Sequence, residues 1–397
     1  MSTAPLIFRK GLDLKHEVAG VLAESYHSEL VEQIKANNYR YATGRLTIHL
    51  AREFGFCYGV DRAVDYAYQA RRRFPDRNVF LTGEIIHNPH VNDELRAQGI
   101  RFLTDAGEDP ATVGPADVVI LPAFGVTVEE LQRLTAAGCT MVDTTCGSVL
   151  NVWKNVSRYA RDGFTSIIHG KYWHEETRAT ASQAMQTAGG HYLVVLDRAE
   201  AAIACDYIRQ SDTANPTRKA AFVERFAEAI SPGFDPDIHL SRIGCANQTT
   251  MLSSESVAVG EMFREAMRER YGEGELANRF RAFDTICSAT QDRQDAVVRL
   301  LDEQPLDLMV VIGGYNSSNT CNLARICAEK IPTYHIADPD RLLSPFEIRH
   351  RSITEKSEIV TRDWWPREGD VRIGLTSGAS TPDNLVEIAV RKLEAFG

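Results

Sequence analysis

The sequence predicts an α/β protein made of three similar domains, each with a mostly parallel sheet, in a pseudo-threefold arrangement around a central site. Three observations support this fold class. Short apolar runs alternate with amphipathic stretches, three cysteines recur in similar contexts, and a polar cluster follows each cysteine at a similar distance. Strand-like runs separated by helical segments are typical of βαβ units with parallel sheets.

The first part of the chain is expected to be a helical arm, residues 1–44. Apolar residues recur there at helical spacing, and Asn37 and Asn38 end the pattern. The first α/β domain then spans residues 45–145, the second 146–286 and the third 287–397. Residues 210–240 interrupt the rhythm of the second domain and are expected to form a partly helical insertion. The expected strands are 45–51, 78–83, 116–124, 165–170, 191–197, 307–315, 332–338 and 371–378.

The three cysteine segments resemble one another in the positions of their cysteine and polar residues more than in their sequences. Cys57 is followed 30 residues later by His87, Cys146 is followed 28 residues later by His174, and Cys287 is followed 29 residues later by Asn316. A helix-length stretch and an apolar strand lie between the two members of each pair. Sites in open α/β sheets form beyond the carboxyl ends of the strands. We therefore expect the three thiols to face one central cavity.

The composition excludes several classes of protein. There are 54 acidic and 44 basic residues among 397, a formal charge of −10, which disfavours non-specific nucleic-acid binding. Apolar runs stay well below the ~18 residues of a membrane span. The first twenty residues lack a continuous apolar stretch, so we expect a cytoplasmic protein without a secretory signal. The eight cysteines form no dense disulfide pattern and fit a reducing compartment.

Three thiolates from separate segments suit either a zinc ion or an iron–sulfur cluster. Zinc ligands usually come in close pairs such as CxxC, and no pair among Cys57, Cys146 and Cys287 has that spacing. A ferredoxin-type electron carrier takes four cysteines in short runs. Three dispersed thiolates would leave one iron of a [4Fe–4S] cluster open to a substrate oxygen. The spacing favours such a central iron–sulfur site over zinc.

Polar residues after the expected strands suit an anion and a proton relay. The run Asn316–Asn319 follows two glycines and precedes a helix; a helix cap needs only one of its four residues. Ser377 and Ser380 suit the same anion cradle. Glu176 follows His174 by two residues and could relay protons with the Thr249 hydroxyl, although a solvated Glu175–Glu176 pair is the plain alternative.

Seven motifs in order, FCYGVDRAV, GEIIHN, DTTC, NQTT, DTICSATQDRQDA, GGYNSSNT and TSGASTPD, closely resemble the family of 4-hydroxy-3-methylbut-2-enyl diphosphate reductases. The resemblance runs from about residue 46 to the C-terminus. The arm and the insertion resemble the longer form found in cyanobacteria, plants and some other bacteria. This family performs the last step of the non-mevalonate isoprenoid pathway.

The resemblance implies a role for each matching residue. It implies a [4Fe–4S] cluster whose open iron binds the allylic hydroxyl of the substrate. It also implies that ferredoxin or flavodoxin donates two electrons and that the product is isopentenyl or dimethylallyl diphosphate. It implies that Glu176 delivers protons and that Thr249 lies close to the substrate hydroxyl. The implied cluster ligands are Cys57, Cys146 and Cys287. The implied substrate-binding residues are His87, His174, Ser317, Ser318, Asn319 and Ser380.

The chain departs from the shorter bacterial form at two places. Phe124 stands where that form has a histidine, so one imidazole contact to the diphosphate is missing. The sequence YWHEE lacks a proline between histidine and glutamate, which makes Glu175 a rival of Glu176. Two other functions stay open: an iron–sulfur dehydratase or lyase similar to quinolinate synthase, and a non-enzymatic iron–sulfur sensor.

Overall fold

The computed structural model describes residues 6–210, 215–283 and 285–397. Contacts along the chain divide these residues into two compact units. Unit 1 comprises residues 124–139 and 145–287. Unit 2 comprises residues 6–123, 140–144 and 288–397. No helix in the described part of the chain is long and apolar enough to cross a membrane.

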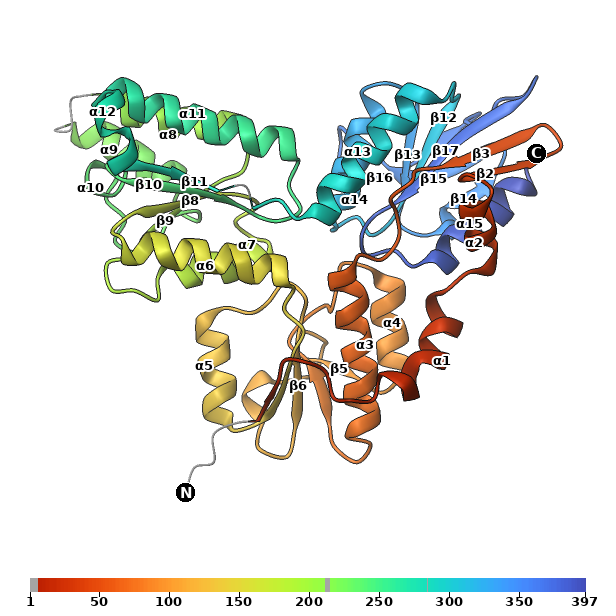
Figure 1. The fold of residues 1–397 in the computed structure, drawn as a ribbon, viewed down its shortest axis with the longest axis horizontal. Coiled ribbons are helices and arrows are strands. Elements are labelled where there is room, and N and C mark those ends of the chain that lie inside the picture. Colours follow the sequence, from red (N-terminus) through yellow and green to blue (C-terminus); the bar gives the residue numbers. More distant parts are fainter. Residues whose placement is uncertain (1–5, 211–214, 284) are drawn as a thin grey trace. The chain divides into compact units, whose positions relative to one another are not determined.

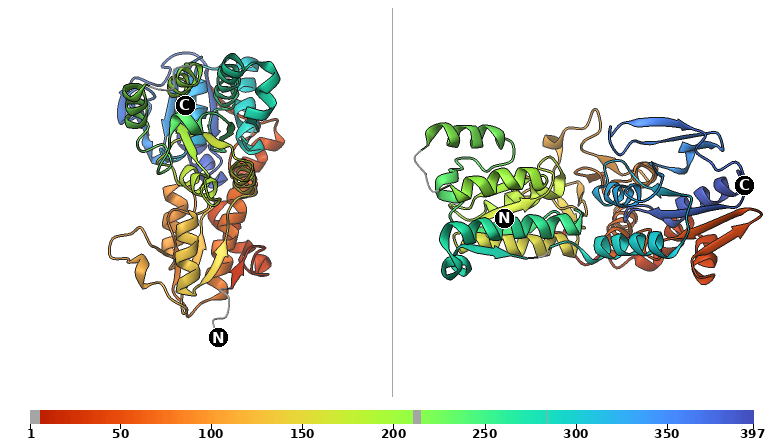
Figure 2. Two further views of the ribbon diagram at one scale, coloured as in Figure 1. Left: turned by 90° about the vertical axis from the view of Figure 1, so that its left-hand side faces the viewer. Right: turned by 90° about the horizontal axis from the view of Figure 1, so that it is seen from above.

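Unit 1 contains one four-stranded parallel sheet, in the order β11-β10-β8-β9. In Figure 1, helix α6 covers one face of this sheet and helices α8 and α11 cover the other; α8 and α11 lie side by side in Figure 2 as well. A cluster of buried apolar residues lies on each face. The strands are β8 (Thr165–His169), β9 (Tyr192–Val195), β10 (Ile243–Asn247) and β11 (Phe280–Ala282). The helices are α5 (Val128–Ala137), α6 (Gly147–Arg161), α7 (Glu175–Ala184), α8 (Arg198–Arg209), α9 (Pro216–Arg225), α10 (Pro236–His239), α11 (Ser253–Tyr271) and α12 (Glu273–Arg279).

Unit 2 contains two sheets, of which the first has five parallel strands in the order β1-β7-β6-β4-β5. Its apolar core joins this sheet to α1 and α3. The strands are β1 (Ile7–Phe8), β4 (Val79–Leu81), β5 (Arg101–Phe102), β6 (Val118–Leu121) and β7 (Thr140–Asp143). The helices of this part are α1 (Lys15–Tyr26), α3 (Tyr58–Arg73), α4 (Pro89–Ala97) and the short 3-10 helix η1 (Pro110–Thr112).

The second sheet of unit 2 has eight strands, in the order β14-β15-β13-β12-β17-β3-β2, with β16 paired to β15. Its centre is parallel and its two edges are antiparallel. The strands are β2 (Arg40–Thr43), β3 (Leu46–Leu50), β12 (Leu308–Ile312), β13 (Thr333–Ile336), β14 (Leu342–Ser344), β15 (Glu347–Arg351), β16 (Glu358–Arg362) and β17 (Val371–Ser377). The helices are α2 (Glu29–Ala36), α13 (Ser288–Glu303), α14 (Ser318–Ala328), α15 (Asp383–Glu394) and the 3-10 helix η2 (Pro339–Arg341).

The predicted fold class, α/β with mostly parallel sheets, is confirmed, and each of the eight expected strands is present. The central strands are mostly apolar and largely buried, as expected for parallel strands whose two faces are covered. In the predicted arm, α1 and α2 are helical, whereas β1 and β2 extend two different sheets; residues 1–5 lie outside the described part. In the predicted insertion, α9 and α10 are helical, and residues 211–214 lie outside the described part of the chain.

The pseudo-threefold arrangement and the domain boundaries stay predictions. Strand β3, at the start of the first predicted domain, pairs with β17.

Candidate functional site

Three cysteines stand at the start of three helices. Cys57 is the N-cap of α3, Cys146 is the N-cap of α6, and Cys287 directly precedes α13. All three are half-buried, and the sulfur atoms of Cys57 and Cys146 do not cap their helices. The N-terminal end of a helix favours negative charge, so each position suits a thiolate. Cys146 lies at a strand-to-helix junction, since β7 ends at Asp143 and α6 begins at Gly147.

The other five cysteines lie in different surroundings. Four of them are buried, and burial raises the pKa of Cys205 to about 12 and also raises the pKa of Cys245 and Cys327. Cys321 is half-buried beside the Tyr315 carbonyl. A thiol held neutral by burial is a poor metal ligand. Burial and position therefore distinguish the three helix-start cysteines from the rest. The four buried ones are Cys139, Cys205, Cys245 and Cys327.

The loop after β12 forms the N-terminus of α14 in unit 2. Ser317 is the N-cap, and its hydroxyl oxygen accepts a hydrogen bond from the backbone N–H of Thr320 at 3.3 Å. Ser318 and Asn319 lie in the first turn and are buried. One residue of the polar run therefore caps the helix, which leaves the next two for another task. The first-turn N–H groups of a helix are a ready anion site.

Asn319 connects this loop to the loop after β17. Its Oδ1 accepts a hydrogen bond from the backbone N–H of Ala379 at 3.0 Å, which fixes the orientation of the amide. Its Nδ2 is buried and has no hydrogen-bond partner among the described residues. A buried donor without a partner costs about 1–3 kcal/mol. The amide is thus a donor that a bound anion could satisfy.

His87 lies against both of these loops. Its backbone carbonyl accepts a hydrogen bond from the Ser380 hydroxyl at 3.4 Å, and a Cβ on Gly314 would lie 2.4 Å from the same oxygen. The side chain of Asn88, the N-cap of α4, donates to the Ser380 carbonyl at 2.8 Å. Only glycine allows this close approach at position 314. Unit 2 therefore brings four predicted substrate-binding positions together: His87, Ser317, Asn319 and Ser380.

The same loop reaches the first cysteine. The backbone N–H of Cys57 donates to the Ala379 carbonyl at 3.1 Å, and Ala379 in turn donates to Asn319. The N–H of Gly55 donates to the Ser377 hydroxyl at 3.0 Å. Residues 377–380 thus fix the cysteine segment and the polar loop by direct hydrogen bonds. Within unit 2, the predicted cluster ligand and the predicted anion cradle share one scaffold.

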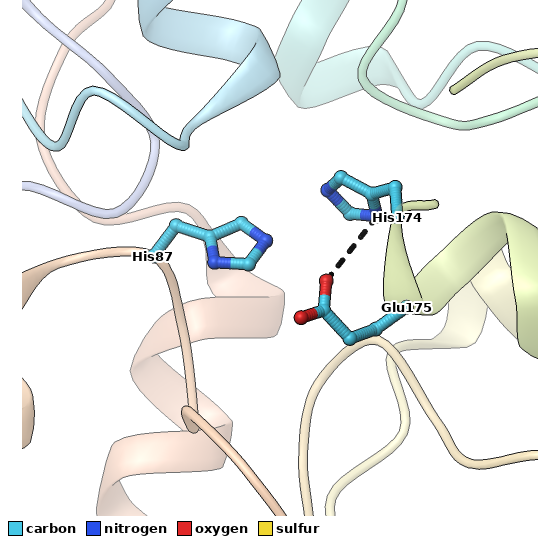
Figure 3. Close-up of side chains that lie close together, drawn as sticks. All are labelled: His87, His174 and Glu175. Carbon is cyan, nitrogen blue, oxygen red and sulfur yellow. Dashed lines mark ion pairs between the residues drawn. The ribbon is translucent and has the colours of Figure 1, made fainter. Parts of the chain in front are cut away.

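In unit 1, His174 is the N-cap of α7. Its Nδ1 accepts a hydrogen bond from the backbone N–H of Glu176 at 3.1 Å. An accepting Nδ1 carries no hydrogen, so Nε2 carries it and can donate. The Glu175 carboxylate faces the same Nδ1 at 3.8 Å, as Figure 3 shows. An ion pair with Glu175 would need a hydrogen on Nδ1. The backbone N–H of Glu176 is closer to Nδ1 than the Glu175 carboxylate is, so Nδ1 acts as an acceptor and carries no hydrogen.

Glu176 and Thr249 form a direct contact within unit 1. The Glu176 carboxylate accepts the backbone N–H of Thr249 at 2.5 Å and the Thr249 hydroxyl at 3.1 Å. Glu176 is 1% exposed, whereas the Glu175 side chain is 56% exposed. Between the two rivals, Glu176 is the one with a buried carboxylate and a hydroxyl within proton-transfer reach. The plain alternative of a solvated pair therefore fits only Glu175.

Phe124 lies beside His174 in unit 1. Their ring centroids are 5.5 Å apart and the rings meet edge to face at 80°. Such a contact is favourable and fixes the plane of the imidazole. The aromatic ring at this position thus provides a packing contact to His174. The neighbouring Gly125 has a φ of +76°, and a Cβ there would lie 2.4 Å from the Trp153 ring.

Three residues with close contacts to the predicted site were not predicted. Glu84 Oε2 accepts the hydrogen of His87 Nδ1 at 2.7 Å. Gln248 is buried, and its Oε1 accepts hydrogen bonds from the Lys171 backbone and the Thr177 hydroxyl. Arg293 is buried on α13. Glu84, Gln248 and Arg293 lie within the motifs GEIIHN, NQTT and DTICSATQDRQDA, so motif membership was the signal available for each.

Comparison with known proteins identifies close relatives. The chain is 50% identical to the 4-hydroxy-3-methylbut-2-enyl diphosphate reductase of Synechococcus sp. (strain RCC307) over 388 residues, covering 97% of this chain and 92% of the relative. It is 49% identical to the protein of the same name from Gloeobacter violaceus over 398 residues, covering 98% of this chain and 93% of the relative. Both matches are cyanobacterial and cover nearly the whole chain, as expected for the longer form.

Solved structures give the same result. A structure of (E)-4-hydroxy-3-methyl-but-2-enyl diphosphate reductase, described as the terminal enzyme of the non-mevalonate pathway, matches with a TM-score of 0.51 at 27% identity, covering 88% of this chain and 99% of that chain. The Plasmodium falciparum reductase shares the fold, with a TM-score of 0.61 at 20% identity, covering 87% of this chain and 86% of that chain. The family model described as LytB protein matches residues 48–394. The chain therefore belongs to the LytB family of 4-hydroxy-3-methylbut-2-enyl diphosphate reductases, which are oxidoreductases.

Proposed function

We propose that the protein removes the hydroxyl group of (E)-4-hydroxy-3-methylbut-2-enyl diphosphate reductively and releases isopentenyl and dimethylallyl diphosphate. The allylic C–O bond breaks, the oxygen leaves as water after taking up one proton, and a second proton is added to carbon. Two electrons complete the balance. A ferredoxin or flavodoxin supplies them in this proposal. The buried Nδ2 of Asn319, which has no hydrogen-bond partner in the part of the chain that the structure describes, carries the proposal because it supports an anionic substrate.

The cysteine positions fit the cofactor that this family implies. Cys57, Cys146 and Cys287 would hold one [4Fe–4S] cluster, because each is half-buried at the start of a helix and four of the other five are buried. When bound, the cluster supplies electrons and one iron without a protein ligand that acts as a Lewis acid. Every other part of the chemistry falls to the protein's own residues.

Hydrogen-bond donors of the protein bind the diphosphate. His87, Ser317, Ser318, Asn319 and Ser380 lie on connected loops of unit 2, and His174 can donate from Nε2. Hydrogen bonds to an anion are stronger than bonds between neutral groups. The chain has a net charge of −10, so local donors and helix α14 must hold the substrate against an unfavourable overall field.

Glu176 acts as the proton donor, and Thr249 positions it. A buried carboxyl group tends to stay protonated at neutral pH, which suits a general acid. The two hydrogen bonds from Thr249 fix both carboxyl oxygens. The Thr249 hydroxyl can pass a proton between the carboxyl group and the substrate oxygen, since a hydroxyl both donates and accepts.

The decisive experiment is anaerobic purification with iron and sulfide analysis, followed by an assay with the allylic diphosphate and reduced viologen. The proposal predicts iron and sulfide in the ratio of one cluster per chain, together with reductant consumption that depends on the substrate. A colourless protein that binds zinc would overturn it. Substrate turnover without consumption of reductant would favour the dehydratase or lyase, and a cluster without turnover would favour the sensor.

A further inference from the structure

Arg293 is a buried cation on α13, the helix that follows Cys287. The residue is 4% exposed. Its acceptors among the described residues are main-chain carbonyl groups: Nη1 donates to Ala289 at 2.8 Å, and Nη2 donates to Gly55 at 2.8 Å and approaches the Phe54 carbonyl at 3.5 Å. Its Nε has no hydrogen-bond partner among those residues. This guanidinium therefore connects the first turn of α13 to the segment just before Cys57.

A buried cation held by carbonyl groups is costly. Arginine is rarely buried without a partner, and desolvation of such an ion costs several kcal/mol. Carbonyl dipoles recover part of that cost, but a carboxylate would recover more. Arg293 is the charged residue on the buried face of α13, whereas Ala296, Val297 and Leu300 of the same helix lie in an apolar cluster. An anionic group near Arg293 would therefore stabilise this buried positive charge.

Cys57, a predicted cluster ligand, lies two residues after the Gly55 carbonyl that Arg293 holds. Gly55 accepts from Arg293 through its carbonyl and donates through its N–H to Ser377, and Cys57 donates to Ala379 in the same loop. The segment is thus held by residues 377–379 at Gly55 and Cys57, and by the guanidinium at the Gly55 carbonyl. Outer hydrogen bonds of this kind orient metal ligands and tune the metal.

We propose that Arg293 is a positioning residue for the cluster: it clamps the Cys57 segment and holds a fixed positive charge against the Gly55 carbonyl, two residues before the predicted ligand. This inference rests on the proposed function. A cluster with three thiolate ligands is anionic, and reduction adds negative charge. A fixed positive charge in a low-dielectric environment stabilises the reduced form more than the oxidised form. Arg293 therefore raises the reduction potential and slows the loss of iron.

The test compares Arg293→Gln and Arg293→Lys with Arg299→Gln, an exposed arginine of the same helix. Each holoprotein is titrated with reductant and followed by electron paramagnetic resonance, and iron release to a strong chelator is timed under argon. We expect Arg293→Gln to have a more negative midpoint potential and iron release faster by about 10-fold or more, the usual scale for outer-shell substitutions. Arg293→Lys should keep the potential near that of the wild type and still release iron faster. Arg299→Gln should match the wild type in both.

The potential separates this role from a merely structural one. A structural arginine would change iron release and thermal stability in both variants without a difference in potential between Gln and Lys. Wild-type potential and release rate in Arg293→Gln would overturn the inference. If Arg293→Gln does not fold, Arg293→Lys decides, because a wild-type release rate in that variant would refute the clamp. Wild-type protein without iron would instead refute the proposed function itself.

Discussion

Replacement of Glu176 by glutamine separates proton delivery from structure. The carboxyl group of Glu176 accepts hydrogen bonds from the backbone N–H and the hydroxyl of Thr249. A glutamine side chain has the same shape; its carbonyl oxygen can accept the Thr249 N–H, and its amide can donate to the Thr249 hydroxyl, which rotates to accept. Both contacts survive, but the group can no longer release a proton.

The magnitudes of the two effects differ strongly. The carboxyl group is neutral while it holds the proton to be donated, and glutamine is neutral as well, so the exchange replaces neutral hydrogen bonds of about 1 kcal/mol by similar ones. We therefore expect the stability to change by about 1 kcal/mol or less. Loss of a general acid lowers the rate about 10²–10⁴-fold, which is about 3–5 kcal/mol in the barrier.

The assay measures anaerobic turnover of the allylic diphosphate with reduced viologen, with iron content and thermal unfolding as checks. We expect kcat of Glu176→Gln to fall by about 10²–10⁴-fold with iron content unchanged. Glu175→Gln is the matched control, since that side chain is 56% exposed and lies next in the sequence. It should retain most of the wild-type turnover.

Two results would refute this assignment. Full turnover in Glu176→Gln would show that the buried carboxyl group donates no essential proton. Loss of turnover in Glu175→Gln, with Glu176→Gln active, would transfer the role to the exposed neighbour. A variant that unfolds or loses iron points to a structural role for the Glu176–Thr249 contact and also contradicts the expected outcome.

Three further predictions concern the anion cradle, a buried histidine and a cysteine. Asn319→Ala removes the donor aimed at the diphosphate, so KM should rise about 10–100-fold, as expected for one hydrogen bond to a charged group, with kcat less affected; steady-state kinetics check this, and an unchanged KM contradicts it. Burial lowers the pKa of His335 from its ordinary 6.5 to about 4. As the pH falls, the unfolded chain therefore takes up this proton before the folded protein does. The resulting contribution to the free energy of unfolding, roughly 3 kcal/mol, is complete above pH 6.5 and is lost as the pH falls toward 4. His335→Gln should flatten the decrease in urea-unfolding free energy over that window, and an unchanged slope contradicts the linkage. Cys146→Ser should abolish the iron content yet stabilise the apoprotein by about 1 kcal/mol, because serine caps a helix and this cysteine does not; a lower apoprotein Tm together with retained iron contradicts both expectations.

The central strands were predictable because burial on both faces leaves an apolar run in the sequence. The strands at the edge of the eight-stranded sheet could not be predicted in this way. Strands β15 and β16 have the sequences EIRHR and EIVTR, and their residues alternate between more and less exposed positions. They contain charged side chains, so they lack the continuous apolar run that identified the central strands. The position of β3 was also beyond local reasoning: its pairing with β17 joins residues 46–50 to residues 371–375, and no local pattern specifies that partner.

The candidate site divides in the same way. Spacing after the cysteines was sufficient to select His87, His174 and the NSSN loop, because the repeat places residues at strand ends. The sequence suggested a relay between Glu176 and Thr249 but not the two hydrogen bonds that join them, and it gave no sign that Arg293 holds the Gly55 carbonyl, because these contacts join distant segments. Contacts of this kind decide protonation and geometry, and they depend on tertiary packing alone.

The helix-start cysteines show why the placement repeat was informative. An N-cap position favours Ser, Thr, Asp or Asn, whose oxygen satisfies a free N–H and contributes about 1 kcal/mol. Cys57 and Cys146 hold N-cap positions with extended backbone angles and form no such bond. A protein under selection for stability alone would gain by serine at both positions. The repeated loss of a cap is therefore a physical signal that the sulfur serves another purpose, and metal ligation is the purpose for which sulfur surpasses oxygen.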